Sequence, residues 1–287
     1  MNIIHGYRCD KALRDSFNAL AEQIFGGLNF EGWYQNGFWG DNYDPHSIII
    51  DGKVVSNVSV DRTDLMIGGK RYKILQLGTV MTAPEHRGRG YGREIMEYID
   101  REYADVDGIY LFGNDSVVDY YPKFGFRPGR EIEYRKAVSQ TGESKAVQVK
   151  MDGPAGWSRL AEAMGKSTFR EGCPMVDNPG LIFFYVSQFM QEAVWQLPEL
   201  DAWAVAEIED GTLTLHNVFA DAAVSIDDVI GSFGAEVRKV VLGFAPEHTD
   251  GWELGELQEE DCHFFVKGAV FGEFEERQLR IPSLSHA

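Results

Sequence analysis

The chain has 287 residues, of which 44% are hydrophobic and 25% charged, a composition typical of a globular protein long enough for two domains. It contains no apolar run long enough to span a bilayer, and its N-terminus lacks the basic region and apolar core of a secretory signal. Its three cysteines, Cys9, Cys173 and Cys262, fit neither a disulfide framework nor a zinc-binding spacing. We therefore expect a cytoplasmic protein with no membrane partner.

The net charge of −18 is concentrated in the second half of the chain. Residues 1–150 carry 19 Lys and Arg against 21 Asp and Glu, a difference of −2, whereas residues 151–287 carry 8 against 24, a difference of −16. Nucleic acids bind basic surfaces, so this distribution argues against a nucleic-acid partner. The acidic half would attract a cationic substrate, although acidic surfaces also simply keep proteins soluble.

The first half alternates helical and strand patterns. A helix is predicted where apolar residues recur at helical spacing and two glycines follow, and hairpins where Asp51-Gly52 and Gly68-Gly69 separate apolar runs. In chain order, the predicted elements are a helix, two hairpins, a second helix and two strands: residues 10–25, 47–50 with 53–61, 64–67 with 72–82, 91–103, 108–113 and 126–134.

Low hydrophobicity over residues 143–150 predicts a domain boundary near residue 145, which gives a first domain of residues 1–145 and a second of residues 146–287. The second domain reads as a smaller α+β unit with a hairpin around Asp210-Gly211. Its predicted elements are residues 156–164, 181–191, 202–209 with 212–218, 224–233, 239–244 and 262–266. The order of hairpin, helix, strand and late strand repeats that of the first domain, which is compatible with a degenerate copy of the same fold.

The most informative segment is Arg87-Gly88-Arg89-Gly90-Tyr91-Gly92, which lies between a predicted strand and a predicted helix. Glycines let the backbone approach a ligand, and the N–H groups and dipole of a helix start favour an anion. Two arginines add cations suited to phosphate. The segment predicts a diphosphate site. Its spacing is neither the dinucleotide fingerprint nor the Walker loop, and a purely structural glycine turn is the alternative.

A second motif follows at a fixed distance. The predicted strand 108–113 leads to Asn114, then to Tyr121 seven residues on, and then to Phe124-Gly125-Phe126. With Thr82-Ala83-Pro84 before the loop, this pattern resembles the GNAT superfamily of acyl-CoA-dependent N-acetyltransferases. The resemblance covers about residues 2–136 and is strongest to larger bacterial members with a second domain. Thr82 departs from the pattern, because an aliphatic residue is usual there.

The resemblance implies an α/β (α+β) GNAT fold, a mixed and mostly antiparallel twisted sheet flanked by helices, with acetyl-CoA as the cofactor. It implies that the strand end before the loop pairs with the pantetheine arm and polarises the thioester carbonyl. Asn114 would bind the pantetheine amides, with a helix cap as the structural alternative. The cofactor-binding residues expected on this basis are Val80, Met81, Thr82, Arg87, Gly88, Arg89, Gly90, Tyr91, Gly92, Arg93 and Asn114.

Tyr121 is the candidate general acid, because a phenol with a pKa near 10 can protonate a thiolate whose parent thiol has a pKa near 8.5. A packed aromatic residue is the alternative. Strand 74–82 lacks the carboxylate that many family members use as general base. Asp61, Glu31 and a chain of water molecules are the alternatives for the general base. Some two-domain relatives use the terminal carboxylate as the base, which here belongs to Ala287.

His86 reads as a surface or phosphate-proximal residue. The other histidines show no metal spacing, so we expect no metal.

We therefore expect an N-acetyltransferase that moves an acetyl group directly, in a ternary complex, to a primary amine of a small molecule. That substrate could be cationic, and a homo-oligomer is left open. A protein or peptide amine is the enzymatic alternative. A coenzyme-A-binding regulator without turnover is the other, because the strand before the loop lacks a carboxylate.

Overall fold

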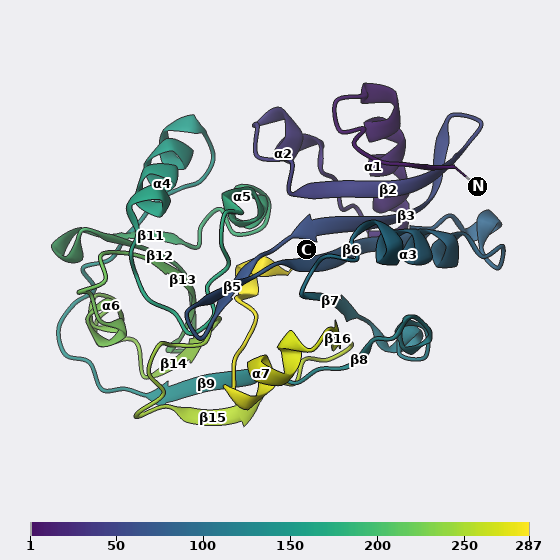
Figure 1. The fold of residues 1–287 in the computed structure, drawn as a ribbon. Helices are drawn as coiled ribbons and strands as arrows, with labels where there is room; N and C mark the ends of the chain where they lie inside the picture. The colour runs from purple at the N-terminus through teal and green to yellow at the C-terminus, as the bar shows by residue number, and fades with distance from the viewer. Residues whose placement is uncertain (1, 287) are drawn as a thin grey trace.

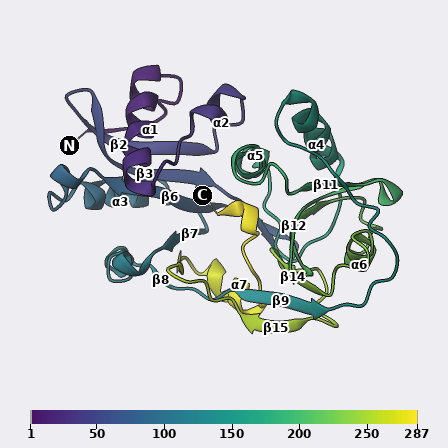
Figure 2. The same ribbon diagram turned by 180° about the vertical axis from the view of Figure 1, so that it is seen from behind.

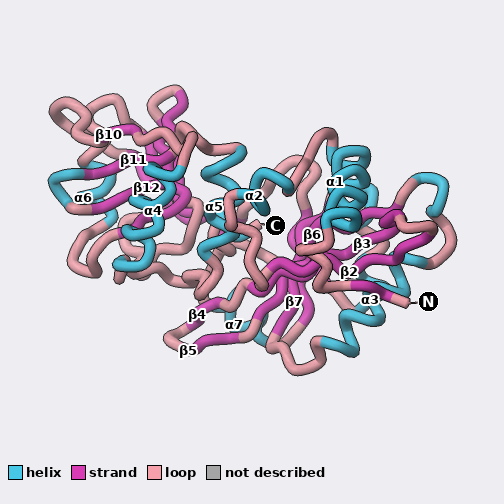
Figure 3. Tube along the Cα trace, turned by 90° about the horizontal axis from the view of Figure 1, so that it is seen from above, coloured by secondary structure: helices cyan, strands magenta, loops and turns pink. Residues whose placement is uncertain are grey.

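The chain folds around two mixed seven-stranded sheets. In this computed structural model, which describes residues 2–286, the sheet nearest the N-terminal helices lies on the right of Figure 1 and the other on the left. The view from above separates the two halves most clearly (Figure 3). No helix within residues 2–286 has both the length and the apolar character needed to cross a membrane.

The strands of the first sheet, in spatial order, are β1 (Ile3–Ile4), β2 (Tyr43–Ile50), β3 (Lys53–Arg62), β6 (Ile74–Thr82), β7 (Gly108–Gly113), β16 (His263–Lys267) and β8 (Arg127–Pro128). Those of the second are β10 (Val147–Gln148), β11 (Val194–Leu197), β12 (Ala202–Glu209), β13 (Thr212–Phe219), β14 (Lys239–Leu242), β9 (Ile132–Ala137) and β15 (Glu253–Glu256). The turn Gly68-Gly69 joins a separate pair, β4 (Leu65–Ile67) and β5 (Lys70–Tyr72).

The helices are α1 (Lys11–Phe25), α2 (Glu31–Gln35), α3 (Tyr91–Glu102), α4 (Pro154–Lys166), α5 (Pro179–Gln188), α6 (Ile226–Gly231) and α7 (Val270–Glu276). Helix α1 begins where the Asp10 side chain accepts the N–H groups of Ala12 and Leu13 and ends at Gly26, whose φ of 67° is left-handed.

The two sheets repeat one pattern of strand directions. Across each sheet, three antiparallel pairings are followed by one parallel pairing and two antiparallel ones. The parallel pair is β6 with β7 in the first sheet and β13 with β14 in the second, and a helix, α3 or α6, connects each pair. This agreement supports the repeat expected from the sequence.

Each half of the chain contributes a strand to the other sheet. Strand β9, from the first half, pairs with β14 and β15, whereas β16, from the second half, pairs with β7 and β8. The prediction of one strand over residues 126–134 is therefore wrong, because the segment divides into β8 in the first sheet and β9 in the second. Strands from either side of the predicted boundary near residue 145 thus take part in the opposite sheet. The view from behind shows β9, of the first half, beside β15 of the second (Figure 2).

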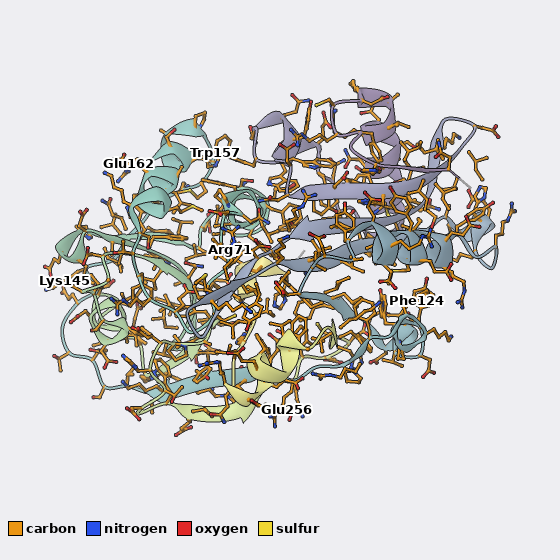
Figure 4. All side chains as sticks on the ribbon, in the orientation of Figure 1. Arg71, Phe124, Lys145, Trp157, Glu162 and Glu256 are labelled. Atoms are coloured by element: carbon orange, nitrogen blue, oxygen red, sulfur yellow. The ribbon has the colours of Figure 1, made fainter. Side chains whose placement is uncertain are left out.

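The region between the two halves is filled by side chains from both (Figure 4). Arg71, labelled near the centre of Figure 4, pairs with Asp64 of its own half and with Asp177 of the other at 2.7 Å. An aromatic core joins α2 to α5, where the stacked rings of Phe30 and Phe184 have centroids 5.3 Å apart. These contacts fix α5 against the first sheet, beside the candidate site.

Candidate functional site

The first sheet opens where its two parallel strands separate. Pairing of β6 with β7 ends at Leu77 and Leu111, although β6 continues to Thr82. On its other side, β6 bulges against β3, and Thr79 has a φ of 47°. A cavity of about 390 Å³ lies at this opening, lined by Gly78, Thr79 and Val80 of β6 together with the end of β7. Backbone at such an opening can pair with the amides of an extended ligand.

The glycine loop lies between the end of β6 and α3. Gly88 and Gly90 have φ values of 75° and 83°, and a Cβ atom added to either would meet nothing within 4 Å. Gly90 is the N-cap of α3, and among the described residues no side chain caps the first turn of this helix. This geometry fits the predicted diphosphate group.

Of the predicted loop cations, Arg87 and Arg89 are exposed and donate to the carbonyls of Thr82 and Glu85. These bonds hold both guanidinium groups close to the loop.

Of the remaining residues predicted to bind the cofactor, one lines the cavity and the others make contacts elsewhere in the protein. Val80 lines the cavity, whereas Met81 is 3% exposed and packs into the core with the aromatic cluster. The Thr82 hydroxyl shares a hydrogen bond of 2.8 Å with that of Ser56. Tyr91 is buried, and Arg93 lies over the ring of Phe124, 5.5 Å from its centroid.

A methyl group on Gly92 would meet the Tyr120 hydroxyl at 2.8 Å. Gly92 therefore makes room for Tyr120, a contact that the sequence did not indicate.

Asn114 lines the cavity and also caps the short 3-10 helix Asp115–Val117. Its side-chain oxygen accepts the backbone N–H and the hydroxyl of Ser116, at 3.1 and 2.6 Å. The capping role that was the structural alternative for Asn114 is therefore present. Because the carbonyl end of the amide is engaged in the cap, its NH2 end is the part left to meet a pantetheine carbonyl.

Tyr121 lies seven residues after Asn114 and lines the same cavity. Its ring packs against Phe265, with centroids 5.4 Å apart, and against Phe126. Burial, and then the neighbouring Tyr120, raise the pKa of the Tyr121 phenol above its usual value. The hydroxyl is therefore protonated at neutral pH, as a general acid requires, although the higher pKa also makes it a weaker proton donor.

The last residues that the structure describes form part of the cavity wall, which sequence reasoning missed. His286 lines the cavity, and its Nε2 atom is buried without a hydrogen-bond partner among residues 2–286. Tyr185 donates to the carbonyl of His286, and Tyr110 donates to that of Ser285 at 2.8 Å. Burial lowers the pKa of His286 to about 3, so its imidazole is neutral. Ala287 lies outside the described residues.

The carboxylates considered from the sequence lie elsewhere. Glu31 pairs with Arg14 at 2.6 Å, which lowers the pKa of that carboxyl, and it does not line the cavity. Asp61 is 1% exposed and accepts from Asn178 at 2.8 Å, and burial raises its pKa to about 7. It does not line the cavity, although its charge acts on Tyr43 and Tyr185, which do.

His86 has a buried Nδ1 atom without a hydrogen-bond partner among residues 2–286 and lies close to Tyr91. It ends the 3-10 helix Pro84–His86, just before the glycine loop, and does not line the cavity.

One group of metal-ligating residue types gathers at the far edge of the first sheet. His5, Asp44 and His46 bring ligand atoms within 4.8 Å of one another. Their hydrogen bonds are largely internal: His5 bonds the Asp44 carboxylate at 3.0 Å, and His46 bonds the Asp44 carbonyl and the Tyr103 hydroxyl.

The mixed sheet flanked by helices is the fold that the sequence resemblance to the GNAT superfamily implied. Residues 11–129 match the family model described as an acetyltransferase (GNAT) domain. This segment, 119 of the 287 residues, is therefore similar to a GNAT acetyltransferase domain. No protein of curated function matches the sequence.

Solved structures share the fold over nearly the whole chain. A probable N-acyltransferase from Enterococcus faecalis V583, itself of unknown function, is 14% identical with a TM-score of 0.62, over 96% of this chain and 74% of that one. Eis1 from Mycobacterium abscessus is 12% identical with a TM-score of 0.55, over 92% and 73%. A GCN5-related N-acetyltransferase from Kribbella flavida is 17% identical with a TM-score of 0.53, over 93% and 72%. At these identities the likeness shows the fold alone.

Proposed function

We propose that this protein transfers an acetyl group from acetyl-CoA to a primary amine of a small molecule, directly and in a ternary complex. One observation carries the proposal: a single cavity joins the bulge of β6, Asn114 and Tyr121, and Gly92 at the start of α3 lies against Tyr120, the neighbour of Tyr121. Binding, carbonyl polarisation and proton donation to a thiolate thus have candidate groups in one place.

The residues have distinct roles in this proposal. The N–H groups after Gly90, with Arg87 and Arg89, hold the diphosphate. The backbone of residues 78–82 and the amide of Asn114 hold the pantetheine arm and polarise the thioester carbonyl. Acetyl-CoA supplies an activated acyl group. Tyr121 gives its phenolic proton to the departing sulfur, and the proton that the attacking nitrogen loses then restores the phenol.

The amine must be neutral to attack. His286 is the one imidazole among the described residues lining the cavity, and its neutral form can accept a hydrogen bond from an amine N–H. No Asp or Glu among those lining residues would hold the amine as an ammonium ion. We infer that the amine reaches the cavity as the free base.

A coenzyme-A-binding regulator is the second candidate, favoured by the same lack of a carboxylate among the described residues that line the cavity. Free thiol released from acetyl-CoA across a set of primary amines, measured beside calorimetry with coenzyme A, separates the two. An acetyltransferase releases thiol in proportion to acetylated amine. A regulator binds coenzyme A and releases none, and this result would contradict the proposed function.

A further inference from the structure

The cavity beside Tyr121 has an apolar wall built by the helices that pack above the first sheet. The residues of this apolar wall come from the end of α1, the following loop, α2 and α5: Phe25, Leu28, Phe30, Trp33, Leu181 and Phe184. The Trp33 indole N–H donates to the Gly180 carbonyl at 2.8 Å, so its hydrogen-bonding need is met away from any ligand. The wall therefore offers ring faces and aliphatic carbon.

The polar groups around the cavity are few, and several are already engaged. The Tyr43 hydroxyl bonds that of Thr79, and the Tyr185 hydroxyl donates to the carbonyl of His286. Among described residues, none of those lining the cavity is Asp, Glu, Lys or Arg. If a substrate carried a further ammonium group besides the reacting amine, that group would lose its hydration in this cavity and meet no opposite charge. Such burial of an unpaired charge is strongly unfavourable.

A larger cavity of about 800 Å³ adjoins the first, and Trp33 and Tyr43 line both. Two acidic residues, Glu171 and Asp177, line only the second cavity. The acidic character of the second half of the chain thus does not extend to the wall facing Tyr121. The net charge of the chain suggested a cationic substrate, but the described residues lining this cavity include no acidic side chain that would pair with such a charge.

We propose that the acceptor is a primary monoamine on an aliphatic or aromatic hydrocarbon body, which rests on the apolar wall while its nitrogen meets His286. This inference rests on the proposed acetyl transfer and narrows its substrate class. Apolar bodies suit such a pocket because burial removes carbon surface from water, and the ring faces add stacking contacts. Polyamines and amino sugars are disfavoured because their further cationic or hydroxyl groups would be buried unpaired.

The test compares hexylamine with 1,6-diaminohexane, which has the same chain and one further ammonium group. With acetyl-CoA saturating, kcat/KM for hexylamine should exceed that for the diamine at least tenfold, and 2-phenylethylamine should be used as well as hexylamine or better. Glucosamine and spermidine should be poor acceptors. A diamine, polyamine or amino sugar preferred over hexylamine would overturn the inference and leave the acetyl transfer intact.

Two matched variants localise the effect. Leu28 is only partly buried, so Leu28→Asp should fold and place a carboxylate in the wall. It should shift the hexylamine to diamine ratio at least tenfold toward the diamine. Leu254→Asp, the same change at a 40% exposed position on β15, should leave the ratio unchanged. If Leu28→Asp instead alters the preference between acetyl-CoA and hexanoyl-CoA and leaves the amine ratio constant, the wall holds an acyl chain and the inference is wrong.

Failure of the proposed function looks different from failure of this inference. If no amine releases thiol while calorimetry still detects coenzyme A, the acetyl transfer itself is wrong and the substrate class falls with it.

Discussion

The imidazole of His286 stacks on the ring of Phe112 at the end of β7, with centroids 3.9 Å apart and planes 20° apart. This contact joins the last described residues of the chain to the strand that precedes Asn114. The approach to it is held by backbone bonds as well, since Ser283 donates to the Gly243 carbonyl and Ile281 to the Glu131 carboxyl. The cavity is thus built from both ends of the sequence.

The diphosphate role of the loop is tested by Gly90→Val against Gly251→Val. Both glycines have φ near 80° and no heavy atom within 4 Å of an added Cβ, so the backbone strain should be alike. Only Gly90→Val places a side chain beside the start of α3, and coenzyme A affinity should fall at least tenfold in that variant alone. Calorimetry on folded protein measures this. Equal affinities in the two variants would make the loop purely structural.

The acid role is tested by Tyr121→Phe, with Tyr120→Phe as its neighbouring control. Each change removes one hydroxyl and keeps the ring, so folding and coenzyme A affinity should survive. We expect kcat to fall roughly 10²-fold in Tyr121→Phe, the effect of losing a general acid, and to change little in Tyr120→Phe. The reverse order of effects would assign the proton to Tyr120.

The buried carboxyls predict how stability depends on pH. Burial raises the pKa of Asp61 to about 7 and that of Glu131 to about 7, whereas in the unfolded chain both lie near 4. Between these values the unfolded chain releases protons that the folded protein keeps, so the free energy of unfolding falls as pH rises from about 4 to 7. When the folded and unfolded pKa values of a carboxyl differ by one, the free energy of unfolding changes by about 1.4 kcal/mol across that interval.

Asp61→Asn should remove part of this pH dependence, because the amide can still accept from Asn178 and never ionises. Denaturant unfolding at pH 5 and pH 8 gives the slope. Asp105→Asn is the control, since Asp105 is exposed and paired with Lys73, and its pKa is lowered rather than raised. An unchanged slope in Asp61→Asn would mean that Asp61 is ionised in the folded protein.

Because β9 and β16 each pair in the sheet of the other half of the chain, we predict that a fragment ending near residue 145 does not fold on its own. A fragment of residues 1–145 lacks β16, so one edge of β7 and the whole of β8 lose their partner. Exposed strand edges favour aggregation. The fragment should therefore not show a cooperative unfolding transition unless residues 146–287 are co-expressed. A fragment that unfolds cooperatively alone would show that the exchange is not needed for stability.

The sequence predicted the parts of the fold that depend on local signals. Helix 10–25 was found because its cap, period and closing glycines lie close together in the chain, and the spacing from Asn114 to Tyr121 located the short segment lining the cavity. The exchange of β9 and β16 was missed because pairing partners over a hundred residues apart leave no local pattern.

His286 was missed for the same reason. Its place in the cavity depends on the path of the residues after α7. Hydrogen bonds to the Gly243 carbonyl and the Glu131 carboxyl fix that path. The burial of Asp61 could not be predicted either. Its neighbours in the strand, Val60 and Arg62, do not indicate whether the Asp61 side chain faces the core or the solvent.

A structure of the protein crystallised with coenzyme A tests the central claim most directly. The account predicts the diphosphate on the N–H groups that follow Gly90, the pantetheine arm between β6 and β7, and the thiol within hydrogen-bonding distance of the Tyr121 hydroxyl. Coenzyme A bound away from the opening of β6 and β7, or a thiol that does not reach Tyr121, would contradict it.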